Sequence, residues 1–301
     1  MHSDYGVPSA DTAPGASPDS ATQVPSIILE QRANGVAVIT LNRPRSANAI
    51  SAQLSRELDD VLQLLRSDSD VRVLVLTGAG RHFCAGADLR DPEQEATGWL
   101  DIARRGVDTL AAMPIPVIAA INGTAVGGGL ELALACDIRI AEPGAKLGLP
   151  EVKIGALPGA GGLSRLQAVV GAHPAMTLVM TGRVITAEEG ERLGLVSLPA
   201  PGTSAVQTAM ALADEIAQMA GYATRTAKLI FQQTFGRAPD SAMRTEYGLV
   251  DRMATPEERE AEQRRAAERD PVYARIFAES VPAASGASST NGGRSGPQPS
   301  V

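Results

Sequence analysis

The chain has 301 residues, 44% of them hydrophobic but only 3% aromatic, and a formal net charge of −7. This length permits a large aliphatic core in one or two domains. An acidic balance without a basic block argues against a dedicated nucleic-acid binder, and two cysteines with three histidines are poor material for disulfides or a metal centre. No apolar run reaches the roughly 18–20 residues of a membrane span and no secretory signal opens the chain, so we expect a cytoplasmic protein.

The two ends of the chain have a composition of their own. Residues 1–25 and 281–301 consist mainly of Ser, Pro, Ala, Gly and other small or polar residues, with few large apolar side chains. Such segments bury too little surface to offset the entropy lost on ordering. We therefore predict a disordered tail at each end.

The first regular elements follow the N-terminal tail. Ile27–Glu30 and Val36–Leu41 are apolar, β-rich runs joined through an Asn-Gly pair, which is a strong hairpin signal. Ser51–Leu65 has apolar residues at helical spacing, and the Ser51 hydroxyl suits the N-cap position. The sequence therefore predicts a hairpin followed by a helix.

Strands and helices then alternate. Val71–Leu76, Val117–Ile121 and Asp137–Ala141 are short apolar runs typical of buried strands. Between them, Trp99–Ala112 and Gly128–Ala135 have the pattern of helices. Strand, helix and strand in rotation imply right-handed crossovers and a mostly parallel sheet, so the fold class is α/β.

From about Gly159 onward the pattern is mainly helical. The predicted helices cover 163–170, 174–180, 187–192, 205–219, 223–231 and 257–268. We therefore expect an α/β core at 26–200 and a helical region at 203–278.

Two glycine-rich runs stand at predicted strand ends, where parallel sheets gather their ligands. One is Gly127-Gly128-Gly129, and the other is Phe83–Asp88. Glycine brings backbone N–H groups close to a ligand, and a helix N-terminus adds partial positive charge that would stabilise an enolate oxygen. Close helix packing explains the three glycines equally well, and an ordinary loop explains the second run. Phosphate binding is less favoured, because no complete phosphate-loop motif is present.

Two glutamates accompany these turns. Glu131 lies in the first turn of an apolar helix, and Glu151 follows Pro150, which suits a first helical position. A buried carboxylate is costly without partners, which points to function, although each residue alone also fits a structural first-turn glutamate. Together with the glycine turns they predict an enzyme acting at a thioester carbonyl.

These runs resemble the crotonase superfamily, specifically the enoyl-CoA hydratase/isomerase family, over about residues 27–275. Leu41–Pro44 with Asn48–Ile50 is similar to the family's opening loop along the CoA pantetheine, and Gly155–Gly162 to the turn after its second acid. The resemblance implies a crotonase-like spiral of ββα units with a helical C-terminal trimerisation region.

By position, the resemblance also implies how the substrate is bound. The amides of Ala85 and Gly128 would form an oxyanion hole for the thioester oxygen. Ala85, Gly86, Ala87, Asp88 and Gly128 would line the acyl-CoA site. The C-terminal run departs from the family, with Ala261, Arg265 and Glu268 where glycine, phenylalanine and lysine are usual.

The reaction implied is that of a hydro-lyase: reversible syn addition of water to a trans-2-enoyl-CoA, giving a 3-hydroxyacyl-CoA in fatty-acid oxidation or related acyl-CoA metabolism. Glu131 would take the proton of the attacking water, and Glu151 would protonate C2. No metal or redox cofactor is expected, since coenzyme A is part of the substrate. The expected partners are acyl-CoA and further copies of the chain, as a homotrimer or homohexamer, and neither nucleic acid nor membrane. Two alternatives stay open: another crotonase reaction such as double-bond isomerisation, and a non-catalytic acyl-CoA-binding protein.

Overall fold

The computed structural model describes residues 24–95, 98–200, 202, 204–272 and 275. The predicted disordered tails fall outside these residues, apart from Val24 and Pro25. The chain forms two compact units, with the boundary between Lys228 and Leu229. In the described part of the chain, no helix is long and apolar enough to cross a membrane.

The main sheet of the first unit has six strands in the order β1-β2-β3-β5-β7-β10. The antiparallel pair β1/β2 is the predicted hairpin, and the four remaining pairings are parallel, as expected for an α/β protein. The strand bounds are Ile27–Gln31, Val36–Leu41, Val73–Gly78, Val117–Ile121, Ile138–Ala141 and Leu198–Pro199.

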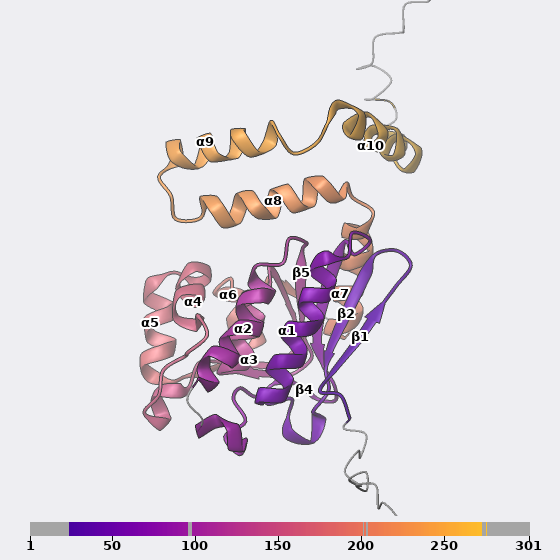
Figure 1. Cartoon of the computed structure of the whole chain (residues 1–301). Helices are drawn as coiled ribbons and strands as arrows, with labels where there is room; N and C mark the ends of the chain where they lie inside the picture. The colour runs from indigo at the N-terminus through magenta and orange to yellow at the C-terminus, as the bar shows by residue number, and fades with distance from the viewer. Residues whose placement is uncertain (1–23, 96–97, 201, 203, 273–274, 276–301) are drawn as a thin grey trace, which may run out of the picture. The chain divides into compact units, whose positions relative to one another are not determined.

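Side-chain alternation along the central strands divides the core between the two faces of this sheet. On β2, Ala37, Ile39 and Leu41 belong to one hydrophobic cluster, whereas Val36 and Val38 belong to the other. The first cluster includes apolar side chains of α1 (Ala52–Ser67) and α2 (Trp99–Ala111), which pack against each other (Figure 1). The period-2 geometry of a strand therefore gives each face its own helical layer.

Helix α7 (Ala205–Ala217) covers the opposite face through a row of small residues. The buried members of this row stand four residues apart: Ala205, Ala209, Ala213 and Ala217. Residues four apart share one face of a helix, and their small size lets the backbone approach the sheet closely. The helix therefore belongs to the same unit as the sheet, which places the boundary later than the predicted one near residue 200.

A second sheet was not predicted, because each of its strands has only three residues. Its order is β4-β6-β8-β9, with bounds His82–Cys84, Thr124–Val126, Lys146–Gly148 and Val184–Thr186. The β4/β6 and β6/β8 pairings are parallel. Strand β6 ends immediately before the glycine run 127–129, and β4 ends at Cys84 within the run Phe83–Asp88, so this small sheet places the two runs side by side.

The remaining helices mostly match the predicted ranges, except α9, which was not predicted. Their bounds are α3 Gly128–Ala135, α4 Gly162–Val170, α5 Ala172–Thr181, α6 Ala187–Arg192, α8 Gly221–Thr234, α9 Pro239–Val250 and α10 Pro256–Arg269, with 3-10 turns η1 Pro44–Ser46, η2 Pro92–Glu95 and η3 Glu151–Ile154. The Ser51 hydroxyl accepts from the Leu54 N–H at the start of α1, which confirms the predicted cap.

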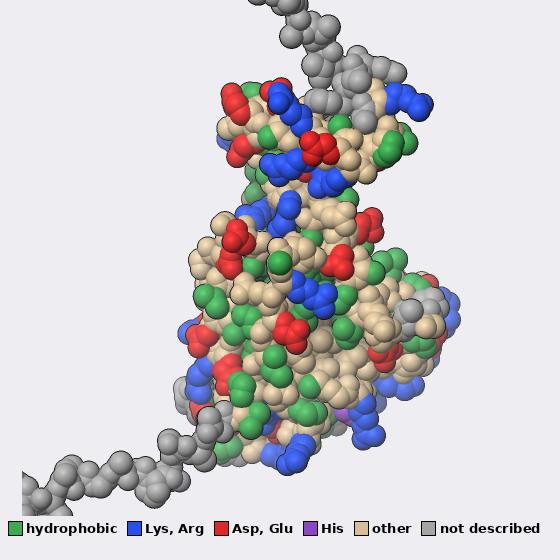
Figure 2. Space-filling model, turned by 90° about the vertical axis from the view of Figure 1, so that its right-hand side faces the viewer, with side chains coloured by type: hydrophobic (Ala, Val, Ile, Leu, Met, Phe, Trp, Pro, Cys, Tyr) green, Lys and Arg blue, Asp and Glu red, His purple; other side chains and the backbone are tan. Residues whose placement is uncertain are grey.

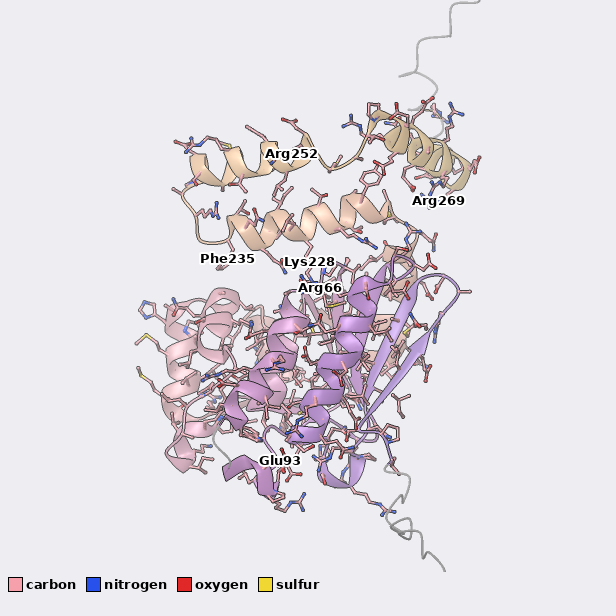
Figure 3. The ribbon with its side chains drawn as sticks, viewed as in Figure 1. Arg66, Glu93, Lys228, Phe235, Arg252 and Arg269 are labelled. Atoms are coloured by element: carbon pink, nitrogen blue, oxygen red, sulfur yellow. The ribbon has the colours of Figure 1, made fainter. Side chains whose placement is uncertain are left out.

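Lys228, the last residue of the first unit, is bound at the end of that unit's sheet. The Lys228 Nζ lies 2.7 Å from Asp137 Oδ2 and donates to the Ile115 carbonyl at 2.9 Å (Figure 3). The lysine is buried, whereas the side chain of Asp137 is partly exposed, so only one member of the ion pair is shielded from water. Elsewhere, on the surface seen in Figure 2, basic and acidic side chains are interspersed.

Candidate active site

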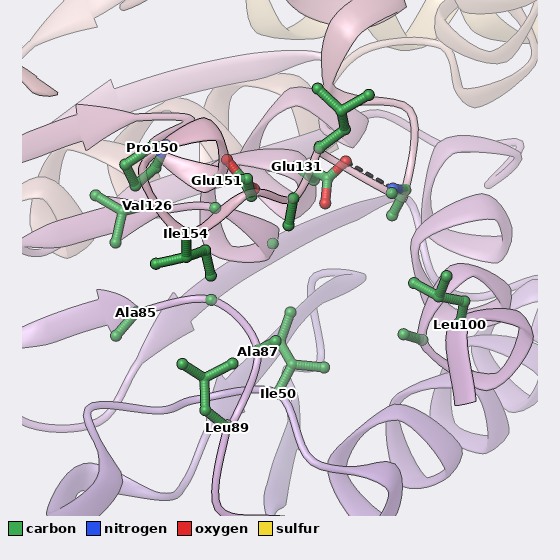
Figure 4. A pocket seen from close by; sticks show the side chains of 18 of the residues that line it. Ile50, Ala85, Ala87, Leu89, Leu100, Val126, Glu131, Pro150, Glu151 and Ile154 are labelled. Carbon is green, nitrogen blue, oxygen red and sulfur yellow. Dashed lines mark hydrogen bonds between the residues drawn. The ribbon is translucent and has the colours of Figure 1, made fainter. Parts of the chain in front are cut away.

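The first unit contains a cavity of about 720 Å³ that most of the predicted site residues line (Figure 4). Its walls come from the segment after β4, the start of α3, η3 with the loop that follows it, and the first turns of α2. The predicted residues in its lining are Ala85, Gly86, Ala87, Gly128, Glu131 and Glu151. The cavity therefore brings together the two glycine-rich runs and both glutamates, which stand far apart in the sequence.

The backbone amides of this cavity require one correction to the predicted oxyanion hole. The Ala85 N–H donates to the Ala47 carbonyl at 3.0 Å, so it is already occupied and cannot serve a ligand. Among the described residues, the N–H groups of Ala87 and Gly128 have no protein acceptor. The two residues lie close together, because a Cβ built on Gly128 would lie 3.8 Å from the Ala87 nitrogen. Ala87 and Gly128 therefore offer two unoccupied N–H groups close together at the cavity wall.

Two of the three glycines are required for separate structural reasons. Gly127 has a φ of +56°, a conformation that L-residues rarely adopt. A Cβ on Gly129 would stand 2.0 Å from the Cys84 carbonyl oxygen, so this residue must be glycine for α3 to pack on β4. Close packing and exposure of the Gly128 N–H are thus both present, in different residues of the same run.

Glu131 is held at the cavity wall by the backbone of the next loop. Its side chain projects from the first turn of α3, and the residue is only 4% exposed. Oε1 accepts from the Ala160 N–H at 2.6 Å (Figure 4). It also accepts from the Gly162 N–H at 2.9 Å. Two donors on one oxygen fix the carboxylate and leave Oε2 free to accept a proton or hold a water molecule.

Glu151 has a different environment, although it lines the same cavity. It is the first residue of η3, after Pro150. Its Oε2 is buried and, within the described residues, has no hydrogen-bond partner. Burial raises the pKa of the Glu151 carboxyl above its ordinary value, and the negative charge of Glu131 raises it further. Two carboxylates with different surroundings are suited to different steps of a proton transfer.

Asp88 does not line the cavity, contrary to the prediction that it contacts the ligand. Its buried carboxylate lies 2.8 Å from Arg43 Nη2 and 3.4 Å from Arg90 Nε. Burial alone would raise the pKa of Asp88, but the hydrogen bond and charge of Arg43 and the hydrogen bonds from Arg90 outweigh it and lower the pKa. Asp88 therefore ties the loop containing Arg43 to the glycine-rich run.

The sequence did not indicate that α2 forms a cavity wall. Trp99, Leu100, Ala103 and Arg104 all line the cavity. The exposure of Leu100, at 48%, is unusual for leucine on an otherwise amphipathic helix. An apolar residue at a solvent-facing helical position was the only local signal, and it does not identify what the side chain faces.

The fold and this cavity together are those of the crotonase class, and comparison with known proteins identifies the family. The model of the enoyl-CoA hydratase/isomerase family matches residues 31–275, and the chain belongs to this family.

Individual relatives agree with this result. The chain is 43% identical over 208 residues to YngF of Bacillus subtilis, whose name places it among the enoyl-CoA hydratases and isomerases; the match covers 67% of this chain and 80% of YngF. It is 38% identical over 208 residues to a short-chain-enoyl-CoA hydratase of Clostridium acetobutylicum, covering 67% and 79%. The crystal structure of an enoyl-CoA hydratase from Bacillus anthracis has a TM-score of 0.72 at 37% identity, covering 75% of this chain and 90% of that one.

Proposed function

We propose that this protein catalyses the reversible syn addition of water to a trans-2-enoyl-CoA, giving a 3-hydroxyacyl-CoA. The observation that carries the proposal is the content of one cavity: two free backbone N–H groups and two carboxylates in different environments. An oxyanion hole alone would suit many reactions of a thioester. A pair of carboxylates beside it suits a reaction that moves two protons.

In the proposed reaction the N–H groups of Ala87 and Gly128 bind the thioester oxygen. They polarise the conjugated double bond, so that C3 becomes electrophilic and the enolate formed on attack is stabilised. The water oxygen forms a bond to C3 and loses a proton to Glu131. The π electrons of the C2–C3 double bond shift toward the thioester oxygen and form the enolate. The thioester carbonyl then re-forms as C2 of the enolate takes a proton from Glu151. One water molecule is added, and no oxidant or reductant is needed.

The division of roles between the glutamates follows their surroundings. Glu131 Oε1 is held by two N–H donors, which stabilise negative charge, and its free Oε2 can accept the water proton. Glu151 keeps its proton to higher pH than an ordinary glutamate, because burial and the nearby Glu131 raise its pKa. A carboxyl that holds its proton suits the donor to C2. We therefore assign Glu131 as the base and Glu151 as the acid.

The proposal extends to assembly and location. We propose a homotrimer or homohexamer in which the second unit provides contacts between subunits. In support, Phe231 is 75% exposed and Phe235, labelled in Figure 3, is 66% exposed, which is unusual for aromatic side chains. Sedimentation of an active, clean monomer would contradict this assembly.

Hydration requires no metal or redox cofactor, so we propose none, and a cytoplasmic location remains a prediction.

The test of the reaction is an assay with a chain-length series of trans-2-enoyl-CoAs, following loss of the conjugated absorbance. Glu131→Gln and Glu151→Gln should each lower hydration by roughly 10²–10⁴-fold, the usual contribution of a general acid or base. Glu191→Gln is the matched control, because Glu191 is exposed on α6 and does not line the cavity. Double-bond isomerisation that survives in one variant would favour an isomerase. Tight acyl-CoA binding without any turnover in the parent would favour a binding protein.

A further inference from the structure

The loop that holds Glu131 is itself held by two arginines. The Gly159 carbonyl accepts from Arg104 Nε of α2 at 2.6 Å, and the Ala160 carbonyl accepts from Arg165 Nη1 of α4 at 2.6 Å. The donors to Glu131 are the Ala160 N–H, which follows the Gly159 carbonyl directly, and the Gly162 N–H, two residues further on. Each arginine therefore binds the backbone that in turn binds the carboxylate.

Arg104 acts on the same peptide group as Glu131. The Gly159 carbonyl and the Ala160 N–H belong to one planar peptide unit, and the described chain has no cis peptide bonds. In a trans peptide the C=O and N–H point in opposite directions. Arg104 on the oxygen therefore directs the N–H at Glu131 Oε1, and its charge polarises the peptide so that the N–H is a stronger donor.

Arg165 completes the arrangement at the following residue. Gly161, with a φ of +87°, leaves room for this side chain, since a Cβ there would stand 2.4 Å from Arg165 Nη1. The Arg165 guanidinium also lies 3.2 Å from Asp108 of α2. Asp108 stands four residues after Arg104, on the same face of the helix. Helix α2 therefore fixes the loop at two successive peptides.

We propose that Arg104 and Arg165 are positioning residues that set the geometry of Glu131 by clamping the loop from Pro158 to Gly162. The inference rests on the proposed function for its kinetic consequence, but the clamp itself is a property of the loop. Arg104 is 45% exposed at the side chain, so it is held by its contact with Gly159 and an exposed ion pair with Asp101 at 3.6 Å, and not by burial of its charge.

The test compares Arg104→Met with Arg105→Met, a matched control on the same helix. Arg105 is exposed and does not line the cavity, so the control removes the same charge without touching the loop. Arg104→Met should lower kcat by about 10- to 100-fold, the range for a supporting group one step from the chemistry, with KM changed less than threefold. Arg104→Lys should restore part of kcat, because an ammonium can still donate to the Gly159 carbonyl. Arg105→Met should match the parent, and all variants should keep the parent melting temperature within a few degrees.

A double-mutant cycle separates positioning from a general structural role. If Arg104 acts through Glu131, adding Arg104→Met to Glu131→Gln should lower kcat by less than about threefold more, so the effects are not additive. A full further loss in that background would overturn the proposal. So would a rise in KM with unchanged kcat, since Arg104 would then bind substrate directly.

Hydrogen–deuterium exchange of peptides that cover the loop tests the proposed clamp independently of turnover. Arg104→Met should speed exchange at residues 160–162, and Arg105→Met should not. An inactive parent with this exchange pattern would refute the proposed reaction and leave the clamp standing. If the parent is active but the loop exchanges equally fast in Arg104→Met and Arg105→Met, the clamp is refuted and the proposed reaction is not.

Discussion

Substitution of Gly129 by alanine should damage both stability and turnover, because this residue is where α3 meets β4. The added Cβ would lie 2.0 Å from the Cys84 oxygen and 2.7 Å from the Cys84 carbonyl carbon. An ordinary C···O contact is about 3.3–3.6 Å, so helix and strand would have to separate by more than roughly 1 Å. The neighbour is backbone and cannot rotate away, which places the cost at the upper end of the roughly 1–3 kcal/mol typical of overpacking.

The same displacement should move the Gly128 N–H relative to that of Ala87. A misplacement of about 1 Å can cost on the order of 100-fold in rate, so turnover should fall by about that factor. Thermal melting should show a loss of about 2–4 °C for each kcal/mol in a unit of this size. The matched control is Gly221→Ala at the start of α8, where a Cβ would meet no atom closer than 3.6 Å. Parent-like stability and turnover in Gly129→Ala would refute the packing argument.

Three further outcomes are expected. The raised pKa of Glu151 means that the native state keeps a proton that the unfolded state loses, so parent stability falls as pH rises from the ordinary glutamate pKa through the raised one. Glu151→Gln should therefore be more stable than the parent above that window in urea titrations and lose this advantage in acid; a constant difference across pH would contradict the assignment. Lys228→Met should cost about 1–3 kcal/mol by leaving Asp137 without its cation, less than for a fully buried pair, because Asp137 is 29% exposed at the side chain. The double variant Asp137→Asn/Lys228→Met should have an unfolding free energy closer to that of the parent than Lys228→Met alone has. Ala209→Leu should lower the unfolding free energy by about 1–3 kcal/mol by forcing α7 off the sheet, and no change would mean that α7 packs loosely.

Local patterns were sufficient to predict most long elements. The hairpin, the capped helix α1 and the buried strands of the main sheet depend on residues that are close in the sequence, and the structure confirms them. The three-residue strands of the second sheet are too short to show a period. Their pairing depends on contacts between segments that are far apart in the sequence, and no local sequence pattern shows these contacts.

The candidate site shows the same limit at the level of single atoms. The chemistry of the two glutamates and the glycine runs was visible in the sequence, and the structure places them in one cavity. Which amide is free was not visible, because the partner of Ala85 is the Ala47 carbonyl from a distant turn. The role of Asp88 likewise depends on Arg43, forty-five residues earlier.

Successive turns of α2 serve different purposes, and this has a consequence for how the family can diversify. Leu100 and Ala103 face the cavity, whereas Gly106 and Leu110 are buried further along the same helix. A change of side-chain size at Leu100 or Ala103 should reshape the cavity and leave the packed interior intact. Variation at the start of this helix can therefore alter which ligands fit the cavity without loss of folding, and the two glutamates in its lining need not change at all.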